Sequence, residues 1–189
     1  MSQISDIDPS LAVFLARFTS ATESEADWGS PVGRLHIRAY LADQEPPPDF
    51  TISVRCVVVR AHSVLVQRDV GSIHILPGGR REPLETPLKT LRRELMEETG
   101  WTLDDVALLG FMHFHHLDPK SPGHRYPYPD FIQSVYTARA RDYCPEGRLD
   151  DGYEVDSTFL PVAQVRELKL TPHERLYLEG ALRAHGLGL

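Results

Sequence analysis

Cysteine and long apolar segments are scarce in this sequence of 189 residues. The two cysteines, Cys56 and Cys144, argue against a small disulfide-stabilised scaffold and favour free or buried thiols in a reducing compartment. No apolar run approaches the ~20 residues that span a bilayer. The first eight residues also lack the basic and apolar regions of a signal peptide. We therefore expect a cytoplasmic protein with no membrane partner.

Basic residues are also fewer than acidic residues. The chain has 20 Lys and Arg residues against 27 Asp and Glu residues, which gives a formal net charge of −7. A nucleic-acid-binding protein needs a basic face, so we expect no nucleic-acid partner. A phosphorylated small molecule is still permitted, because a bound divalent cation inverts the local charge. The hydrophobic content of 41% is enough for the core of one main domain with an extension.

The N-terminal part of the chain begins with a helix signal. Asp8 followed by proline predicts a cap and first turn, and apolar recurrence continues the helix to about residue 20. The small and polar residues 21–30 predict a connection. Alternation of apolar and polar residues then predicts a strand over 35–40.

A proline-rich stretch at 45–49 predicts a stiff linker. We therefore divide the chain into an extension, residues 1–49, and a domain, residues 50–189. In this domain, strands flank one central helix and a second helix closes the chain, which is typical of an α+β layered domain. The predicted strands are 51–59, 64–68, 106–117, 131–139 and 155–160, and a capping box at Thr171 begins the final helix, which ends near Gly186.

The central helix is predicted between Thr86, whose hydroxyl can cap free N–H groups ahead of a proline, and Gly100, a stop signal. At about 100° per residue, three leucines share one side and three glutamates share an adjacent arc. The side fit for burial carries Leu88, Leu91 and Leu95, and the acidic arc carries Glu94, Glu97 and Glu98.

Three glutamates at this spacing repel one another, by roughly 0.2–0.5 kcal/mol per pair. A positive group is therefore expected among them, and carboxylate oxygens favour Mg²⁺, Mn²⁺ or Ca²⁺. Arg93, directly before them, could tether one carboxylate but cannot neutralise three. A solvated helix face is the alternative, and the glutamates alone do not decide between the two.

The surrounding residues favour the metal interpretation. The stretch consists of Gly79, five residues, Glu85, seven residues and then Arg93-Glu-Leu-Met-Glu-Glu-Thr-Gly-Trp101. It resembles the Nudix box, G-x5-E-x7-R-E-U-x-E-E-x-G-U, at every fixed position, and only Trp101 stands where the family more often has an aliphatic residue. The resemblance implies an α/β/α sandwich around a mixed β-sheet, over roughly residues 50–186.

The resemblance also implies Mg²⁺-dependent, or Mn²⁺-dependent, hydrolysis of a diphosphate bond in a nucleoside diphosphate linked to another group, such as ADP-ribose, a nucleotide sugar or a nucleoside triphosphate. Metal ions would neutralise the diphosphate and activate water. The implied ligands are the three glutamates, of which Glu94 or Glu97 also assists in deprotonating water, and the carbonyl of Gly78. Arg93 and Glu85 are implied to orient these ligands.

Further site residues are proposed outside the box. Glu154, in an acidic stretch before a short late strand, is the candidate general base, with an exposed acidic turn as the alternative. The loop 117–130 is long enough to stack a base and contact phosphate, or to form a rigid surface loop or dimer contact. The candidate substrate-binding residues are Arg125, Tyr126 and Tyr128 in this loop and Arg55 and Arg68 on strands, where surface ion pairs are the alternative.

Three histidines, His113, His115 and His116, suggest a transition-metal site at first sight. In a strand the first two share a face and the third points away, so a pocket wall or sheet surface is the favoured interpretation.

Two other functions stay open. A Nudix-fold nucleotide sensor usually loses box glutamates that this chain keeps, and a Nudix-fold isopentenyl-diphosphate isomerase would pair a cysteine with a glutamate. The residues also leave open whether the extension covers the pocket or mediates formation of a homodimer.

Overall fold

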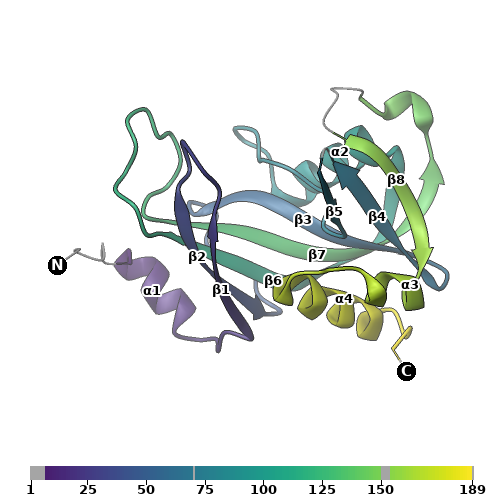
Figure 1. Ribbon diagram of the computed structural model, residues 1–189, viewed down its shortest axis with the longest axis horizontal. Coiled ribbons are helices and arrows are strands. Elements are labelled where there is room, and N and C mark those ends of the chain that lie inside the picture. Colours follow the sequence, from purple (N-terminus) through teal and green to yellow (C-terminus); the bar gives the residue numbers. More distant parts are fainter. Residues whose placement is uncertain (1–6, 70, 150–153, 189) are drawn as a thin grey trace.

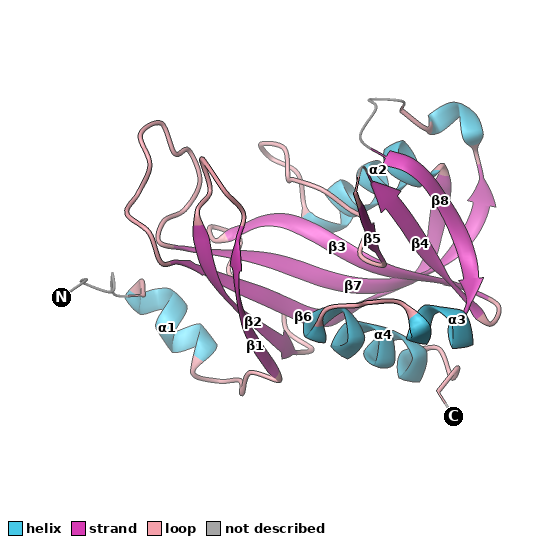
Figure 2. Ribbon diagram, in the orientation of Figure 1, coloured by secondary structure: helices cyan, strands magenta, loops and turns pink. Residues whose placement is uncertain are grey.

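A computed structural model of the protein describes residues 7–69, 71–149 and 154–188, with the side chains of residues 154 and 155 outside this description. One sheet runs through the whole protein in the order β1-β2-β6-β7-β3-β4-β5, and β8 pairs with β4 (Figures 1 and 2). Because β3 and β7 are parallel while the other pairs are antiparallel, the sheet is mixed, as expected. The strands are β1 (Thr22–Asp27), β2 (Arg34–Leu41), β3 (Thr51–Arg60), β4 (Ser63–Asp69), β5 (Ser72–His74), β6 (Trp101–His116), β7 (Asp130–Tyr143) and β8 (Glu154–Pro161).

Helices cover both faces of this sheet, as the side chains of β3 show by packing alternately on one face and the other. Val54, Cys56 and Val58 pack with leucines of α2 (Pro87–Thr99). The valines at 57 and 59 pack in the opposite layer, with α4 (Pro172–Ala184) and α3 (Val162–Glu167). The arrangement confirms the α/β/α sandwich (Figure 2). The two remaining helices are α1 (Pro9–Leu15) and the short 3₁₀ helix η1 (Pro145–Gly147).

The helix α2 forms for the local reasons that its sequence predicts. The Thr86 side chain accepts a hydrogen bond from the Lys89 N–H, and Gly100 ends the helix with φ 73°. Its burial differs from expectation at one position, because Leu91 is 0% exposed and Leu88 is 46% exposed. Leu88 lies in the first turn, ahead of the part of the helix that packs on the sheet, so the buried stripe starts one turn later than predicted.

The N-terminal helix is shorter than predicted. It ends at Leu15 with Ala16 as its C-cap, rather than near residue 20. Phe18, one of the apolar residues that predicted a longer helix, does pack against the core, but it does so from the turn that follows the helix. Its ring lies 5.1 Å from the ring of Phe14 and 5.5 Å from that of Phe111 on β6, as measured between centroids.

The prediction of a connection over residues 21–30 was wrong in its first part. The strand β1 occupies Thr22–Asp27 and pairs with β2 along its whole length. Its residues alternate between half-buried and exposed, although none of them is a large apolar residue. Backbone pairing at the edge of an existing sheet needs no apolar alternation, which is why the pattern gave no signal.

The strands β6 and β7 extend beyond their predicted limits, to 16 and 14 residues. Register shifts interrupt their pairing at three places, and these irregularities explain why the alternation of apolar residues fails near their ends. Among the described helices, none is both long and apolar enough to cross a membrane.

Candidate active site

The loop that precedes α2 is fixed to the sheet by its backbone. The carbonyl oxygens of Pro77 and Gly79 accept hydrogen bonds from the N–H groups of Cys56 and Val54 on β3, both at 3.0 Å. Gly78 between them adopts φ 130°, and a Cβ at this position would collide with the Val54 carbonyl. The loop can therefore lie this close to β3 only because residue 78 is glycine.

The next residue, Gly79, brings the loop against the acidic arc of α2. A Cβ at position 79 would overlap the Glu94 carboxylate, so the missing side chain is what lets this carboxylate lie against the loop backbone. The Glu98 carboxylate is also held by the loop, because its Oε2 accepts a hydrogen bond of 2.8 Å from the Gly78 N–H. Two of the three predicted ligands therefore contact the glycine loop.

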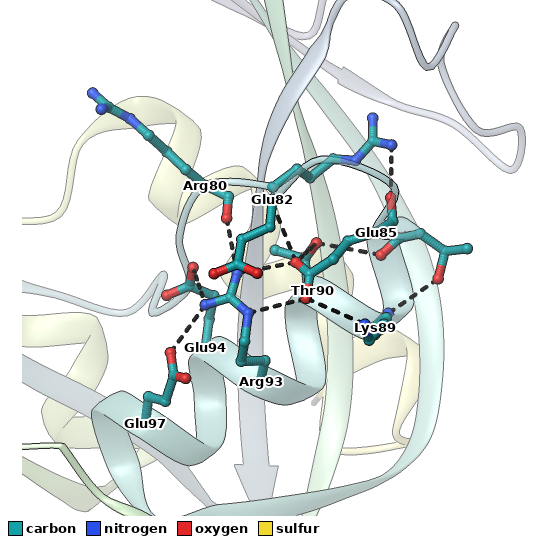
Figure 3. A network of polar contacts seen from close by, with 10 residues as sticks. Arg80, Glu82, Glu85, Lys89, Thr90, Arg93, Glu94 and Glu97 are labelled. Carbon is teal, nitrogen blue, oxygen red and sulfur yellow. Dashed lines mark hydrogen bonds and ion pairs between the residues drawn. The ribbon is translucent and has the colours of Figure 1, made fainter.

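Arg93 connects the box residues to one another (Figure 3). Its Nε and Nη2 donate to the two carboxylate oxygens of Glu85 at 3.1 and 3.0 Å. Its Nη1 lies 2.9 Å from Glu94 Oε1 and 3.0 Å from Glu97 Oε2. Nη2 also donates to the Arg80 carbonyl at 3.1 Å, which ties the helix to the loop.

This network shifts the pKa values of two carboxyl groups in opposite directions. Hydrogen bonding by Arg93, with help from Thr90, lowers the pKa of Glu85 to about 2. Burial raises the pKa of Glu94 above its usual value, and the neighbouring guanidinium of Arg93 only partly opposes this. Glu97 contributes to the same upward shift by like-charge repulsion. A cation at this position would relieve both effects.

The donor chemistry of the box fits a hard divalent cation. Glu94 and Glu97 already approach one positive atom, Nη1 of Arg93, and Glu98 lies one residue further on the helix. In the described part of the chain, no three His, Cys, Asp or Glu side chains already have the arrangement of a metal site. Joint coordination by the three glutamates therefore requires their side chains to rotate from the positions that Arg93 and Gly78 give them.

Arg55 on β3 lies between two hollows at this end of the sheet. It lines an aromatic cavity of about 370 Å³ and also a second, larger cavity of about 750 Å³. Gly78, directly before the box, and Glu98 of the box line the second cavity together with Asp69 on β4. Burial lowers the pKa of the Arg55 guanidinium, whereas the carboxylates of Glu98, Glu94 and Asp69 oppose this shift. Arg55 is thus a cation facing the box.

The aromatic cavity brings together segments that lie far apart in the sequence. Trp28 follows β1, His116 ends β6, and Phe131 is the second residue of β7. The loop 117–130 closes the cavity with Tyr126, whose hydroxyl accepts a hydrogen bond of 2.9 Å from Nη1 of Arg80. The Arg80 guanidinium also lies 4.9 Å from the centroid of the Tyr126 ring. The box loop and this cavity are therefore directly connected.

The structure separates the residues that the sequence grouped as substrate-binding. Arg55, Arg125 and Tyr126 line the aromatic cavity. The hydroxyl of Tyr128 instead donates to the Asp118 carbonyl at 2.9 Å, and its ring contacts that of His116, which lines the cavity. Arg68 is exposed and lines neither of the two cavities beside the box.

Glu154 begins β8, and its backbone pairs with Asp69, but its side chain lies outside the described residues.

The three histidines divide as their alternation predicts. His113 Nε2 and His115 Nδ1 both contact Oδ1 of Asp130, at 2.7 and 2.8 Å, and all three side chains are buried. His116 points to the opposite side, into the aromatic cavity. Sequence reasoning missed Trp28, Ser53 and Arg80 as cavity residues, because each belongs to a different segment and no spacing along the chain links them.

A model of the NUDIX domain matches residues 49–180, more than half of the chain. The chain belongs to the Nudix family. A search of curated proteins found no match. Among solved structures, the Nudix domain resembles a NUDIX hydrolase from Nitrosomonas europaea with 21% identity and a TM-score of 0.53, over 69% of this chain and 86% of that one.

Two other solved structures resemble this Nudix protein at low identity. The NUDIX domain of Shewanella oneidensis NrtR, complexed with ADP ribose, is 19% identical with a TM-score of 0.53, over 70% of this chain and 86% of that one. An ADP compounds hydrolase is 15% identical with a TM-score of 0.54, over 90% of this chain and 96% of that one. At these identities the likeness establishes the Nudix fold.

Proposed function

We propose that this Nudix protein hydrolyses a diphosphate bond in a nucleoside diphosphate linked to another group, with Mg²⁺ or Mn²⁺ as cofactor. The observation that carries the proposal is the position of Arg55. This cation lines both cavities, and the second cavity is also lined by Glu98 of the Nudix box and by Gly78 directly before it. A diphosphate at Arg55 would therefore have an aromatic cavity on one side and the acidic helix on the other.

The two cavities suggest where each part of such a substrate would bind. Trp28, Tyr126 and Phe131 offer flat surfaces against which a base can stack. The second cavity is largely apolar but also carries polar groups, including Gln67, Asp69 and His74, which can hydrogen-bond a hydroxylated group on the far side of the diphosphate. A nucleotide sugar or ADP-ribose would use both cavities, whereas a nucleoside triphosphate would leave much of the second one empty.

Glu94, Glu97, Glu98 and the Gly78 carbonyl are the groups that would hold the metal. When bound, the cation would neutralise the diphosphate and lower the pKa of a water molecule. The protein's own residues hold the ligand side chains in position. Arg93 holds two of the glutamates at 2.9 and 3.0 Å, and Glu85 fixes Arg93 through two hydrogen bonds.

We retain Glu154 as the proposed general base. Its backbone pairs with Asp69 of β4, and Asp69 lines the second cavity beside Glu98. A base that approaches from β8 would thus reach the end of this cavity that faces the box. The proposal places the base outside the helix, so that the three glutamates remain available as ligands.

The similar structures are consistent with this substrate class. One is an ADP compounds hydrolase, and another was solved with ADP ribose. The isomerase alternative has less support, because Cys56 is buried beneath α2 and burial raises the pKa of its thiol far above the ordinary range. We also propose a cytoplasmic location, since both cysteines are free thiols, which persist in a reducing compartment.

The test is a hydrolysis panel on the purified full-length protein with Mg²⁺, with Mn²⁺ and with EDTA. The panel contains ADP-ribose, nucleotide sugars, dinucleoside polyphosphates and nucleoside triphosphates, and products are separated by chromatography. We expect metal-dependent cleavage of the diphosphate bond, with a lower KM for compounds that carry a sugar beyond it. Tight nucleotide binding without any turnover would overturn the proposal and favour a sensor.

A further inference from the structure

His116 lines the aromatic cavity and carries a buried hydrogen-bonding atom without a partner among the described residues. The residue is 6% exposed and its ring packs against those of Tyr128, His124 and Phe131, at 5.3, 5.2 and 5.6 Å between centroids. Its Nε2 is buried and has no hydrogen-bond partner among the described residues. Native proteins rarely leave such an atom unpaired, so a bound ligand is a candidate partner for it.

The chemical state of this ring follows from its neighbours. Burial lowers the pKa of His116, and the nearby ring of His124 lowers it further. The imidazole is therefore neutral at physiological pH, with one N–H and one bare nitrogen. A hydrogen bond joins His116 to the backbone of Val32. Since Nε2 is unpartnered and the bond to Val32 favours the protonated ring, Nδ1–H donates this bond, and Nε2 is left as a buried acceptor on a residue that lines the cavity.

Ser53 on β3 lines the same cavity and carries a second buried polar atom. The residue is 2% exposed, and its Oγ has no hydrogen-bond partner within the part of the chain that the structure describes. A hydroxyl can donate or accept as its ligand requires. The lining of the cavity therefore includes flat aromatic rings, one buried acceptor and one buried hydroxyl, together with the guanidinium groups of Arg55, Arg80 and Arg125.

A flat ligand that satisfies both atoms must bring an N–H donor for His116 and a group that bonds a hydroxyl. Adenine has these features, an exocyclic amino group and ring nitrogens that accept hydrogen bonds. Hypoxanthine carries an oxo group in place of the amino group and a proton on N1, so in the same pose its oxygen would face the bare nitrogen of His116. Two acceptors that face each other in a buried site repel and stay unsatisfied.

We infer that the aromatic cavity selects an adenine-type base, with its amino group donating to Nε2 of His116 and a ring nitrogen accepting from Oγ of Ser53. The inference rests on the proposed function for the placement of the diphosphate at Arg55. It goes beyond that function because it states which base the substrate carries, and it holds for binding even in the absence of metal.

The test compares AMP and IMP, which differ at the amino position, by titration calorimetry on the full chain without metal. We expect AMP to bind at least about tenfold more tightly than IMP, because a site built for a hydrogen bond rejects the analogue that lacks it. His116→Phe keeps an aromatic ring, removes the acceptor and should abolish this preference. The matched control is His124→Phe in the same cavity, since His124 Nε2 already contacts the Pro127 carbonyl at 3.5 Å.

Equal affinity of the wild-type protein for AMP and IMP would overturn the inference, and so would an unchanged preference in His116→Phe. If this variant fails to fold, Ser53→Ala supplies the second measurement, with an expected loss of AMP affinity of about tenfold. The wild-type comparison needs no variant at all.

Failure of the inference and failure of the proposed function give different results. Cleavage of adenine and hypoxanthine diphosphate derivatives with the same KM would contradict base selection and support the proposed hydrolase activity. Selective AMP binding with no turnover of any compound would remove the hydrolase and keep base selection.

Discussion

Glu85 and Arg93 lie eight residues apart and share two hydrogen bonds, with both carboxylate oxygens of Glu85 engaged at 3.1 and 3.0 Å. The Glu85 side chain is 4% exposed, whereas Arg93 reaches outward to Glu94 and Glu97. A buried carboxylate therefore sets the position of the guanidinium that in turn positions two of the proposed ligands. The pair connects the stability of the loop-helix junction to the geometry of the box.

The first prediction concerns the pH dependence of stability. The folded-state pKa of Glu85 is lowered to about 2 from an ordinary 4.5, so its contribution is present above pH 4.5 and is lost as pH falls toward 2. Glu85→Gln should lower the unfolding temperature at pH 7 and flatten its decline between pH 4.5 and 2. Thermal melts across this range in EDTA measure both effects.

The control for this experiment is Glu167→Gln on α3, which replaces an exposed glutamate. Its melting curve should run parallel to that of the wild-type protein at every pH. A parallel curve for Glu85→Gln as well would show that the ion pair with Arg93 does not stabilise the folded state.

The second prediction concerns the proposed metal ligands. Glu97→Gln and Glu98→Gln each keep an oxygen that can accept the hydrogen bond from Arg93 or Gly78, but each loses the charge that a divalent cation needs. Mg²⁺-dependent turnover should fall by at least about 100-fold, because loss of residues that merely orient ligands already costs 10–100-fold. The circular dichroism spectrum should not change. Near-normal turnover in both variants would refute the assignment of this helix face, with Glu167→Gln again as the control.

The third prediction concerns the contact between the glycine loop and the helix. Gly79→Ala places a methyl group where the Glu94 carboxylate lies, and this side chain must then move. Misplacement by about 1 Å can cost roughly 100-fold in rate, so we expect a loss of that order with a small change in melting temperature. Gly188→Ala is the matched control, because its added Cβ would make only ordinary contact with Arg183, at 3.8 Å. A fully active Gly79→Ala protein would show that Glu94 has room to move without consequence.

The sequence predicted the box helix well because its boundaries are local. A threonine cap, a proline in the first turn and a glycine at φ 73° act within a few residues of one another. Such short-range chemistry can be read directly from the order of residues along the chain. The resemblance also implied that Glu85 and Arg93 orient the ligands, but the hydrogen bonds between these two residues were not predicted.

The cavities could not be predicted in this way. Trp28 follows an edge strand whose polar residues gave no strand pattern, and Ser53 and His116 lie on strands separated by β7. What brings these residues together is the order of strands in the sheet, which is a property of long-range pairing. Arg68 was proposed to bind substrate because it lies on a strand beside the box. In the structure its side chain is exposed and lines neither cavity.

The last prediction separates the two leucines that the helical pattern placed on one face. Leu91 is 0% exposed and packs in the core between α2 and β3, whereas Leu88 is 46% exposed. Leu91→Ala removes buried methyl groups and leaves a cavity, so the free energy of unfolding should fall by about 2–5 kcal/mol. Leu88→Ala should change it by less than about 0.5 kcal/mol, as is usual for a surface position. Urea titrations of both variants measure the difference, and similar losses in the two would mean that the first turn of α2 packs on the sheet after all.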